Sequence, residues 1–173
     1  IGKGARRMLP RLTLVLGGAA SGKSAFAEGL VLRSGRAPVY LATAEALDAE
    51  MRGKVKRHRA RRGAEWRTIE APRDPGAALA AVTAAEAVLL DCATMWLSNH
   101  LLAGGDLDAA EAALLSALDA CAAPVAVVSN EVGHSVVPEN ALARRFRNAQ
   151  GALNQRLAAR AGLVVLVVAG LPM

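Results

Sequence analysis

The chain has 173 residues, of which 53% are hydrophobic but only 3% aromatic, so we expect one domain with a core of alanine, valine and leucine. Its formal net charge of +6 favours an anionic partner, which could be nucleic acid, lipid or a nucleotide. No apolar run reaches the roughly 18 residues that a bilayer requires, and the chain opens without an apolar signal-peptide core, which argues against membrane and secreted proteins.

The basic opening stretch IGKGARRMLPR carries no pattern of a folded element. We expect residues 1–11 to be a basic lead that is either disordered or derived from an expression vector, and residues 12–173 to form a single domain. Cys92 and Cys121 stand far apart and outside any metal-ligand spacing. They are expected to be buried, reduced thiols of a cytoplasmic protein.

Short apolar segments alternate with segments of helical character along the chain. The predicted strands span 12–16, 39–42, 66–70, 87–91, 125–129 and 163–168. The predicted helices span 24–34, 45–62, 75–85, 94–103, 107–122 and 140–161, and Asp74-Pro75 is a start signal for the third of them. Because most of the strands are apolar throughout, both faces of the sheet should be covered. The alternation predicts a three-layer α/β domain with a mainly parallel central sheet.

The first predicted strand leads directly into a glycine-rich loop, in the stretch LTLVLGGAASGKS. The loop matches the pattern G-x-x-x-x-G-K-[ST], which begins at Gly17 and ends with Gly22, Lys23 and Ser24. Glycines let backbone amides approach phosphate oxygens, and the following helix adds the positive end of its dipole. Lys23 would reach the β- and γ-phosphates, and the Ser24 hydroxyl would bind Mg²⁺. Because a strand precedes the loop and a helix follows it, a P-loop is favoured over a chance match.

A strand-end acid is the second predicted part of this site. Asp91 closes the apolar run AVLLD. P-loop enzymes hold the magnesium shell with an acid in such a position. Asp91 could instead cap the helix that follows, but the metal-side role is favoured.

Residues 55–67, VKRHRARRGAEWR, hold the densest basic charge in the chain. In a helix over 45–62, His58 extends the apolar stripe that begins at Leu47. Three functions fit: a core-edge histidine beside a solvated basic face, a nucleic-acid patch, or a histidine nucleophile whose neighbouring arginines neutralise a triphosphate. The nucleic-acid interpretation is weak, because Trp66 is the one nearby aromatic residue that could stack on bases. The residues alone favour the first interpretation.

Further segments of the chain change this balance. Besides LGGAASGKS, they are VYLATAEALDAEM, the H-x-x-x-R element HRARR, WRTIEAP, LLDCATMWLSN and SNEVGHSVVPENALARRFRNAQGALNQRLA. Together, from Leu12 to about Pro172, they resemble the bifunctional adenosylcobinamide kinase / adenosylcobinamide-phosphate guanylyltransferase family of cobalamin biosynthesis. A generic P-loop protein shares the first of these segments alone.

The resemblance implies roles for particular residues. His58 would receive GMP covalently and, with Lys23, carry the catalysis. The implied nucleotide-binding residues are Gly17, Gly18, Ala19, Ala20, Ser21, Gly22, Lys23, Ser24, Ala42, Thr43, Ala44, Arg59, Ala60, Arg61, Arg62, Glu70 and Asp91, with Ser24 and Asp91 also on the metal side. The chain departs from the family pattern at Ala20, where arginine is common, and at Asn148, where aspartate is common. Neither departure removes a residue that the chemistry requires.

The resemblance also implies a reaction sequence. The enzyme would phosphorylate adenosylcobinamide with ATP or GTP, and then transfer GMP from GTP through His58 to give adenosylcobinamide-GDP. It would use Mg²⁺ with GTP or ATP, assemble as a homotrimer in the cytoplasm, and have no nucleic-acid or membrane partner. One alternative is a simple small-molecule P-loop kinase, which has no need of His58. Another is a nucleic-acid-stimulated ATPase, against which the shortage of aromatic residues counts.

Overall fold

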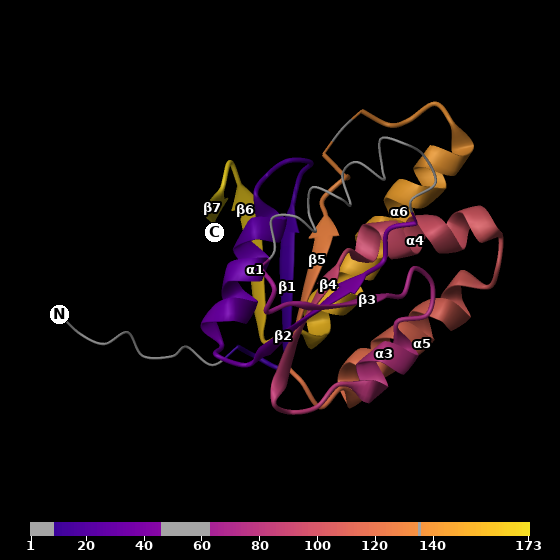
Figure 1. Ribbon diagram of the computed structural model, residues 1–173. Coiled ribbons are helices and arrows are strands. Elements are labelled where there is room, and N and C mark those ends of the chain that lie inside the picture. The colour runs from indigo at the N-terminus through magenta and orange to yellow at the C-terminus, as the bar shows by residue number, and fades with distance from the viewer. Residues whose placement is uncertain (1–8, 46–62, 135) are drawn as a thin grey trace.

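The computed structural model describes residues 9–45, 63–134 and 136–173. It has a mainly parallel sheet that is covered by helices on both faces (Figure 1). The strands are β1 (Leu12–Gly17), β2 (Ala37–Ala42), β3 (Arg67–Glu70), β4 (Glu86–Asp91), β5 (Val125–Asn130), β6 (Leu163–Val168) and β7 (Leu171–Pro172). The helices are α1 (Lys23–Arg33), α3 (Gly76–Ala81), α4 (Ala93–Ala103), α5 (Leu107–Ala120) and α6 (Ala141–Arg160). The strand order is β3-β2-β4-β5-β1-β6-β7, and the β6–β7 pair alone is antiparallel within this sheet. The predicted α/β class with a mainly parallel sheet is confirmed.

Two hydrophobic cores lie on opposite faces of this sheet. Alternate residues of each strand supply them: in β1, Leu14 faces one core and Val15 the other. The larger core lies beneath α3, α4, α5 and α6, where Trp96 is the largest side chain that is fully buried. The smaller core lies beneath α1, which covers the other face alone among the described helices (Figure 1). Burial on both faces explains why the strands are apolar throughout.

All six predicted strands are present, and the helices differ mainly at their ends. α3 was expected over 75–85, but it begins at Gly76, with Pro75 at the N-cap and Asp74 Oδ1 accepting from the Gly76 amide at 3.0 Å. The helix ends early because Val82 is extended and buried, and a turn closed by the Glu86 amide on the Thr83 carbonyl leads into β4. The helix expected over 45–62 lies outside the described residues.

The strand β7 was not predicted, because two residues are too few to show a pattern. It pairs with β6 through the turn at Ala169 (φ 50°) and Gly170 (φ 82°). Positive φ at both central residues is the signature of a type I′ hairpin, whose twist matches that of the strands. This β6–β7 hairpin brings Gly170 against the glycine-rich loop.

No helix within the described part of the chain combines the length and the apolar character needed to cross a bilayer. Cys92 and Cys121 are free and buried, as expected.

Candidate nucleotide site

Six parallel strands, β1 to β6, end at one edge of the sheet, and most of the predicted site residues lie there. The β1–β5 register pairs Gly17 with Asn130, and β2 pairs Ala42 with both Glu70 of β3 and Asp91 of β4. The carboxyl ends of parallel strands are where open α/β sheets bind ligands. The fold therefore gathers Gly17–Ser24, Ala42–Ala44, Glu70 and Asp91 along a common edge.

The conformation of the glycine-rich loop requires glycine at two positions, Gly17 and Gly22. A Cβ at Gly17 would lie 2.4 Å from Ser21 Oγ and 2.7 Å from the Val167 carbonyl oxygen, so no larger residue fits. Gly22 has φ 91° and lies against Gly170, whose Cα would be 3.1 Å from a Cβ added at Gly22. The Gly170 amide also donates to the Ser21 carbonyl at 2.8 Å. The β6–β7 hairpin thus closes over the loop and fixes its path into α1.

Lys23 is the first residue of α1, and its side chain folds back over the loop. Its Nζ donates to the Gly18 carbonyl at 2.9 Å, and the residue is buried. Burial lowers the pKa of the Lys23 ammonium, while the nearby Cys92 and Asp91 act to raise it. A desolvated cation in this place binds phosphate more strongly than a hydrated one would. The contact of Lys23 with phosphate remains a prediction.

Ser24 and Asp91 carry oxygen atoms, the ligands that a hard cation prefers, so these two residues could hold one. Ser24 is half-buried in the first turn of α1, and Asp91 ends β4 on the sheet face that α1 covers. The Tyr40 hydroxyl donates to Asp91 Oδ2 at 3.0 Å. The alternative role for Asp91 is not the one seen, because the N-cap of α4 is Cys92, whose Sγ accepts from the Met95 amide.

Thr43 is fixed by the protein on every side. Its Oγ1 donates to the Cys92 carbonyl and accepts from the Cys92 amide, each at 2.7 Å. Its amide donates to the Asp91 carbonyl at 3.2 Å, and its own carbonyl accepts from Asn99 Nδ2 at 2.8 Å. Thr43 is completely buried. It therefore holds the end of β2 against β4, and a nucleotide contact at 42–44 remains a prediction.

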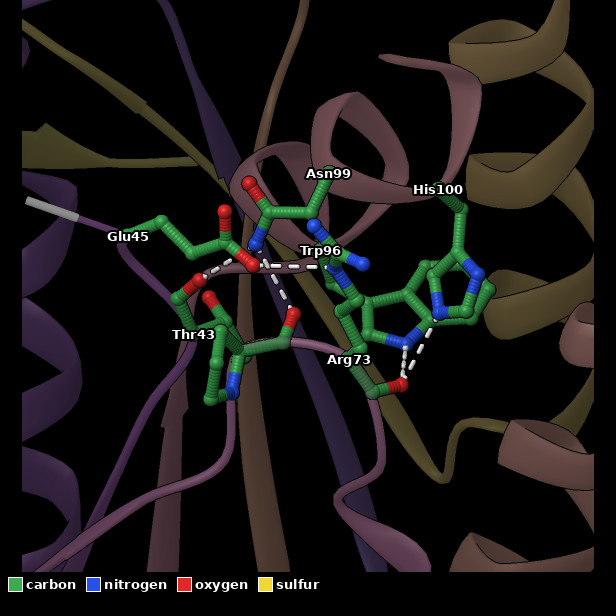
Figure 2. Close-up of polar contacts among 7 residues, drawn as sticks. Thr43, Glu45, Arg73, Trp96, Asn99 and His100 are labelled. Carbon is green, nitrogen blue, oxygen red and sulfur yellow. Dashed lines mark hydrogen bonds and ion pairs between the residues drawn. The ribbon is translucent and has the colours of Figure 1, made fainter. Parts of the chain in front are cut away.

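α4 ties together the loops that follow β2 and β3 (Figure 2). Asn99 Nδ2 donates both to Thr43 O and to Pro72 O, each at 2.8 Å. The next carbonyl along, that of Arg73, accepts from Trp96 Nε1 at 2.9 Å and lies 2.9 Å from His100 Nε2. The Arg73 guanidinium pairs with Glu45 at 2.9 Å. His100 lies in the last turn of α4, and its ring is tilted against that of Trp96, with centroids 4.6 Å apart and planes at 51°.

A second polar cluster lies at the end of β5, between that strand and α6. Gln150 Nε2 and Ser129 Oγ both bond to Asn154 Oδ1, at 2.9 Å and 2.6 Å, and Asn154 Nδ2 donates to the Asn130 carbonyl at 3.1 Å. The Asn130 amide donates to Thr94 Oγ1 at 2.8 Å. These bonds hold the backbone of Asn130 beside Gly17, on the flank of the glycine-rich loop opposite the hairpin.

Some predicted site residues are not placed here. His58, Arg59, Ala60, Arg61 and Arg62 lie outside the described residues. Sequence reasoning missed Tyr40 and Asn99. A polar residue inside the apolar helix ATMWLSNHLLA was a signal for Asn99, because such a residue needs buried partners. No local signal distinguished Tyr40 from an ordinary core aromatic.

A P-loop at the carboxyl edge of a parallel sheet, with a lysine and a strand-end acid beside it, defines the class of P-loop nucleotide-binding α/β proteins. The fold of a solved structure described as the RadB recombinase agrees, with a TM-score of 0.54, 19% identity and coverage of 92% of this chain and 75% of that one. Within the class, the family model of cobinamide kinase / cobinamide phosphate guanyltransferase matches residues 13–173. The chain belongs to this family, as the sequence motifs predicted.

Relatives agree along nearly the whole length of the chain. The bifunctional adenosylcobalamin biosynthesis protein CobP of Pseudomonas aeruginosa is 47% identical, over 92% of this chain and 94% of its own length. The protein CobU of Salmonella typhimurium, described in the same words, is 44% identical over 92% of this chain and 97% of its own. The chain is therefore an enzyme of the cobinamide kinase and guanylyltransferase family.

Proposed function

We propose that the chain phosphorylates adenosylcobinamide with ATP or GTP, and then converts the product to adenosylcobinamide-GDP through a GMP adduct on His58. The observation that carries the nucleotide part is the buried Lys23 at the P-loop, beside the strand-end acid Asp91. Family membership supports both reactions. The histidine step rests on the resemblance of HRARR to the family motif.

In the kinase step, the acceptor hydroxyl oxygen attacks the γ-phosphorus. The bond between the γ-phosphorus and the oxygen that links it to the β-phosphorus breaks. ADP or GDP leaves, and the hydroxyl proton is released. Lys23 exchanges its hydrogen bond to the Gly18 carbonyl for bonds to phosphate oxygens. Its positive charge there stabilises the negative charge that develops on these oxygens in the transition state. The amide groups of the loop bind the remaining phosphate oxygens.

Ser24 and Asp91 are the residues that would hold Mg²⁺ with the nucleotide. A hydroxyl and a carboxylate at one sheet edge are the oxygen donors that this cation prefers, together with substrate phosphates. When bound, Mg²⁺ neutralises charge on the β- and γ-phosphate oxygens.

In the transferase step, a ring nitrogen of His58 attacks the α-phosphorus of GTP, and pyrophosphate leaves. The phosphate of the corrinoid substrate then displaces His58 and takes the GMP. Arg59, Arg61 and Arg62 neutralise the triphosphate in this proposal. Glu70 and residues 42–44 serve as further nucleotide contacts at the strand ends.

Mass spectrometry after incubation with GTP labelled at the α-phosphate tests the covalent step. We expect one GMP per chain on His58, lost in acid and kept in base, because a P–N bond to imidazole has that stability. His58→Ala should lose the adduct and the transferase reaction but keep kinase activity, whereas Lys23→Ala should lose both. An adduct undiminished in His58→Ala, or a label on the exposed His134, would contradict the assignment.

The assembly and location belong to the same proposal. The family resemblance implies a homotrimer in the cytoplasm, and sedimentation analysis of the purified chain tests the trimer. A monomer at all concentrations would refute it.

A further inference from the structure

Tyr40 reaches the metal-side acid from the neighbouring strand. The β2–β4 register pairs Tyr40 with Leu89, two residues before Asp91. Because alternate residues of a strand share a face, Tyr40 and Asp91 both lie on the side of the sheet that α1 covers. The phenol ring runs along the sheet toward its carboxyl edge, and its hydroxyl donates to Asp91 Oδ2 at 3.0 Å.

The position of this hydroxyl is fixed by packing. Tyr40 is only 6% exposed and belongs to the core beneath α1. Its ring meets the ring of Trp66 edge to face, with centroids 6.2 Å apart and planes at 80°. A phenol has one proton to donate, and a carboxylate can accept several bonds, so Asp91 keeps acceptor capacity for other ligands.

Lys23 and Tyr40 compete for the Asp91 carboxylate, and the orientation of this carboxylate depends on which of them binds it. Lys23 and Asp91 are close enough for the carboxylate to raise the pKa of the ammonium. Even so, in the described part of the chain no direct ion pair joins them: Lys23 Nζ donates to Gly18 O, and Asp91 accepts from Tyr40. A direct Lys23–Asp91 pair would occupy the two groups that the phosphates and the cation need.

We propose that Tyr40 is a positioning residue, whose hydroxyl holds the Asp91 carboxylate away from Lys23 and toward the metal side of the nucleotide. Because Asp91 has a metal-side role only within the proposed function, this inference rests on that function. In this proposal Tyr40 acts through Asp91 and not by direct contact with the nucleotide or the cation.

Tyr40→Phe tests the role, because it removes the hydroxyl and keeps the ring against Trp66. Calorimetry would measure the affinity for a non-hydrolysable GTP analogue in EDTA, with Mg²⁺ and with Mn²⁺. We expect the gain in affinity that either cation confers to fall about tenfold, as for other groups that orient a metal-side carboxylate. Affinity in EDTA should stay unchanged, and the apparent KM for Mg²⁺ in the kinase reaction should rise.

Thr13→Val is the matched control. Thr13 lies on β1 on the same sheet face, and its hydroxyl is fully buried and has no hydrogen-bond partner among the described residues. Removing that hydroxyl should change neither affinity. A Tyr40→Phe variant whose affinity falls equally with and without cation, or does not fall, would overturn the positioning role.

Asp91→Asn separates this inference from the proposed function. If Asp91→Asn keeps the cation-dependent gain in affinity, Asp91 is not on the metal side, and the magnesium part of the proposed function fails together with the inference. If Asp91→Asn loses that gain but Tyr40→Phe keeps it, the inference alone is wrong. Loss in both variants, with Thr13→Val unaffected, is the expected result.

Discussion

The single side chain of Asn99 holds two backbone segments in place. Its Nδ2 donates to Thr43 O and to Pro72 O, and the residue is 3% exposed (Figure 2). Asn99→Leu would leave the buried Thr43 carbonyl and the partly buried Pro72 carbonyl without this donor, which should lower the free energy of unfolding by about 2–4 kcal/mol. Urea denaturation followed by circular dichroism measures this.

The neighbouring Ser98 provides the control for that measurement. Ser98 is half-buried on the same helix, and its side chain makes no hydrogen bond to any residue that the structure describes. Ser98→Ala should change the free energy of unfolding by less than about 0.5 kcal/mol. Asn99→Leu and Ser98→Ala with equal stability would show that the two bonds to the carbonyls contribute nothing.

The site residues that sequence could reveal were those with a local pattern. Gly17, Gly22 and Lys23 belong to one short motif, and Asp91 ends an apolar strand. Tyr40 and Asn99 act on partners 51 and 56 residues away in the chain. Whether such residues meet depends on the strand order and register, which a local pattern does not contain.

At the scale of elements, continuous apolar runs were sufficient to predict the strands, and weaker signals were not. The six apolar strands appear where they were predicted, because burial on both faces leaves few polar positions to confuse them. The C-terminal turn and β7 were missed, although they contribute to the site by closing over the glycine-rich loop. Both Ala169 and Gly170 have a positive φ in this turn. An alanine in the sequence does not indicate a positive φ, so the turn could not be predicted.

The β6–β7 hairpin should therefore affect both stability and nucleotide affinity. Gly170→Ala keeps the amide that bonds to Ser21 O but places a Cβ on a residue with φ 82°. We expect a loss of about 1 kcal/mol in the free energy of unfolding, since a left-handed conformation costs alanine roughly that much. Nucleotide affinity, measured by calorimetry, should fall several-fold because the loop loses part of its support.

Ala169→Gly is the counterpart on the adjacent residue. Here a positive φ of 50° already burdens an alanine, so glycine should not lower the stability and could raise it by up to about 1 kcal/mol. Thermal melting of both variants compares them directly. If Gly170→Ala matches the parent protein in melting and in affinity, the hairpin does not support the loop.

At the scale of the whole molecule, the net charge of +6 comes more from one segment than from the surface as a whole. Several arginines of the described residues are paired with acids: Arg67 with Glu86, Arg73 with Glu45, Arg156 with Glu111 and Arg160 with Asp119. The basic residues of 51–67 outnumber the one acid there, Glu65. Composition alone could not say whether this excess binds a triphosphate or a nucleic acid; family membership now favours the triphosphate.

The two interpretations differ in what charge removal and salt should do. Replacing Arg59, Arg61 and Arg62 by glutamine should raise the GTP concentration needed for adduct formation at least tenfold, because the charges neutralise the triphosphate directly. The control replaces Arg33, Arg36 and Arg145, which are exposed, by glutamine and so removes the same net charge. It should leave the GTP requirement unchanged. Gel shifts of the parent protein with DNA and RNA should show at most weak binding. Tight binding that weakens by about a thousandfold between 50 and 200 mM salt would identify the patch as a nucleic-acid site.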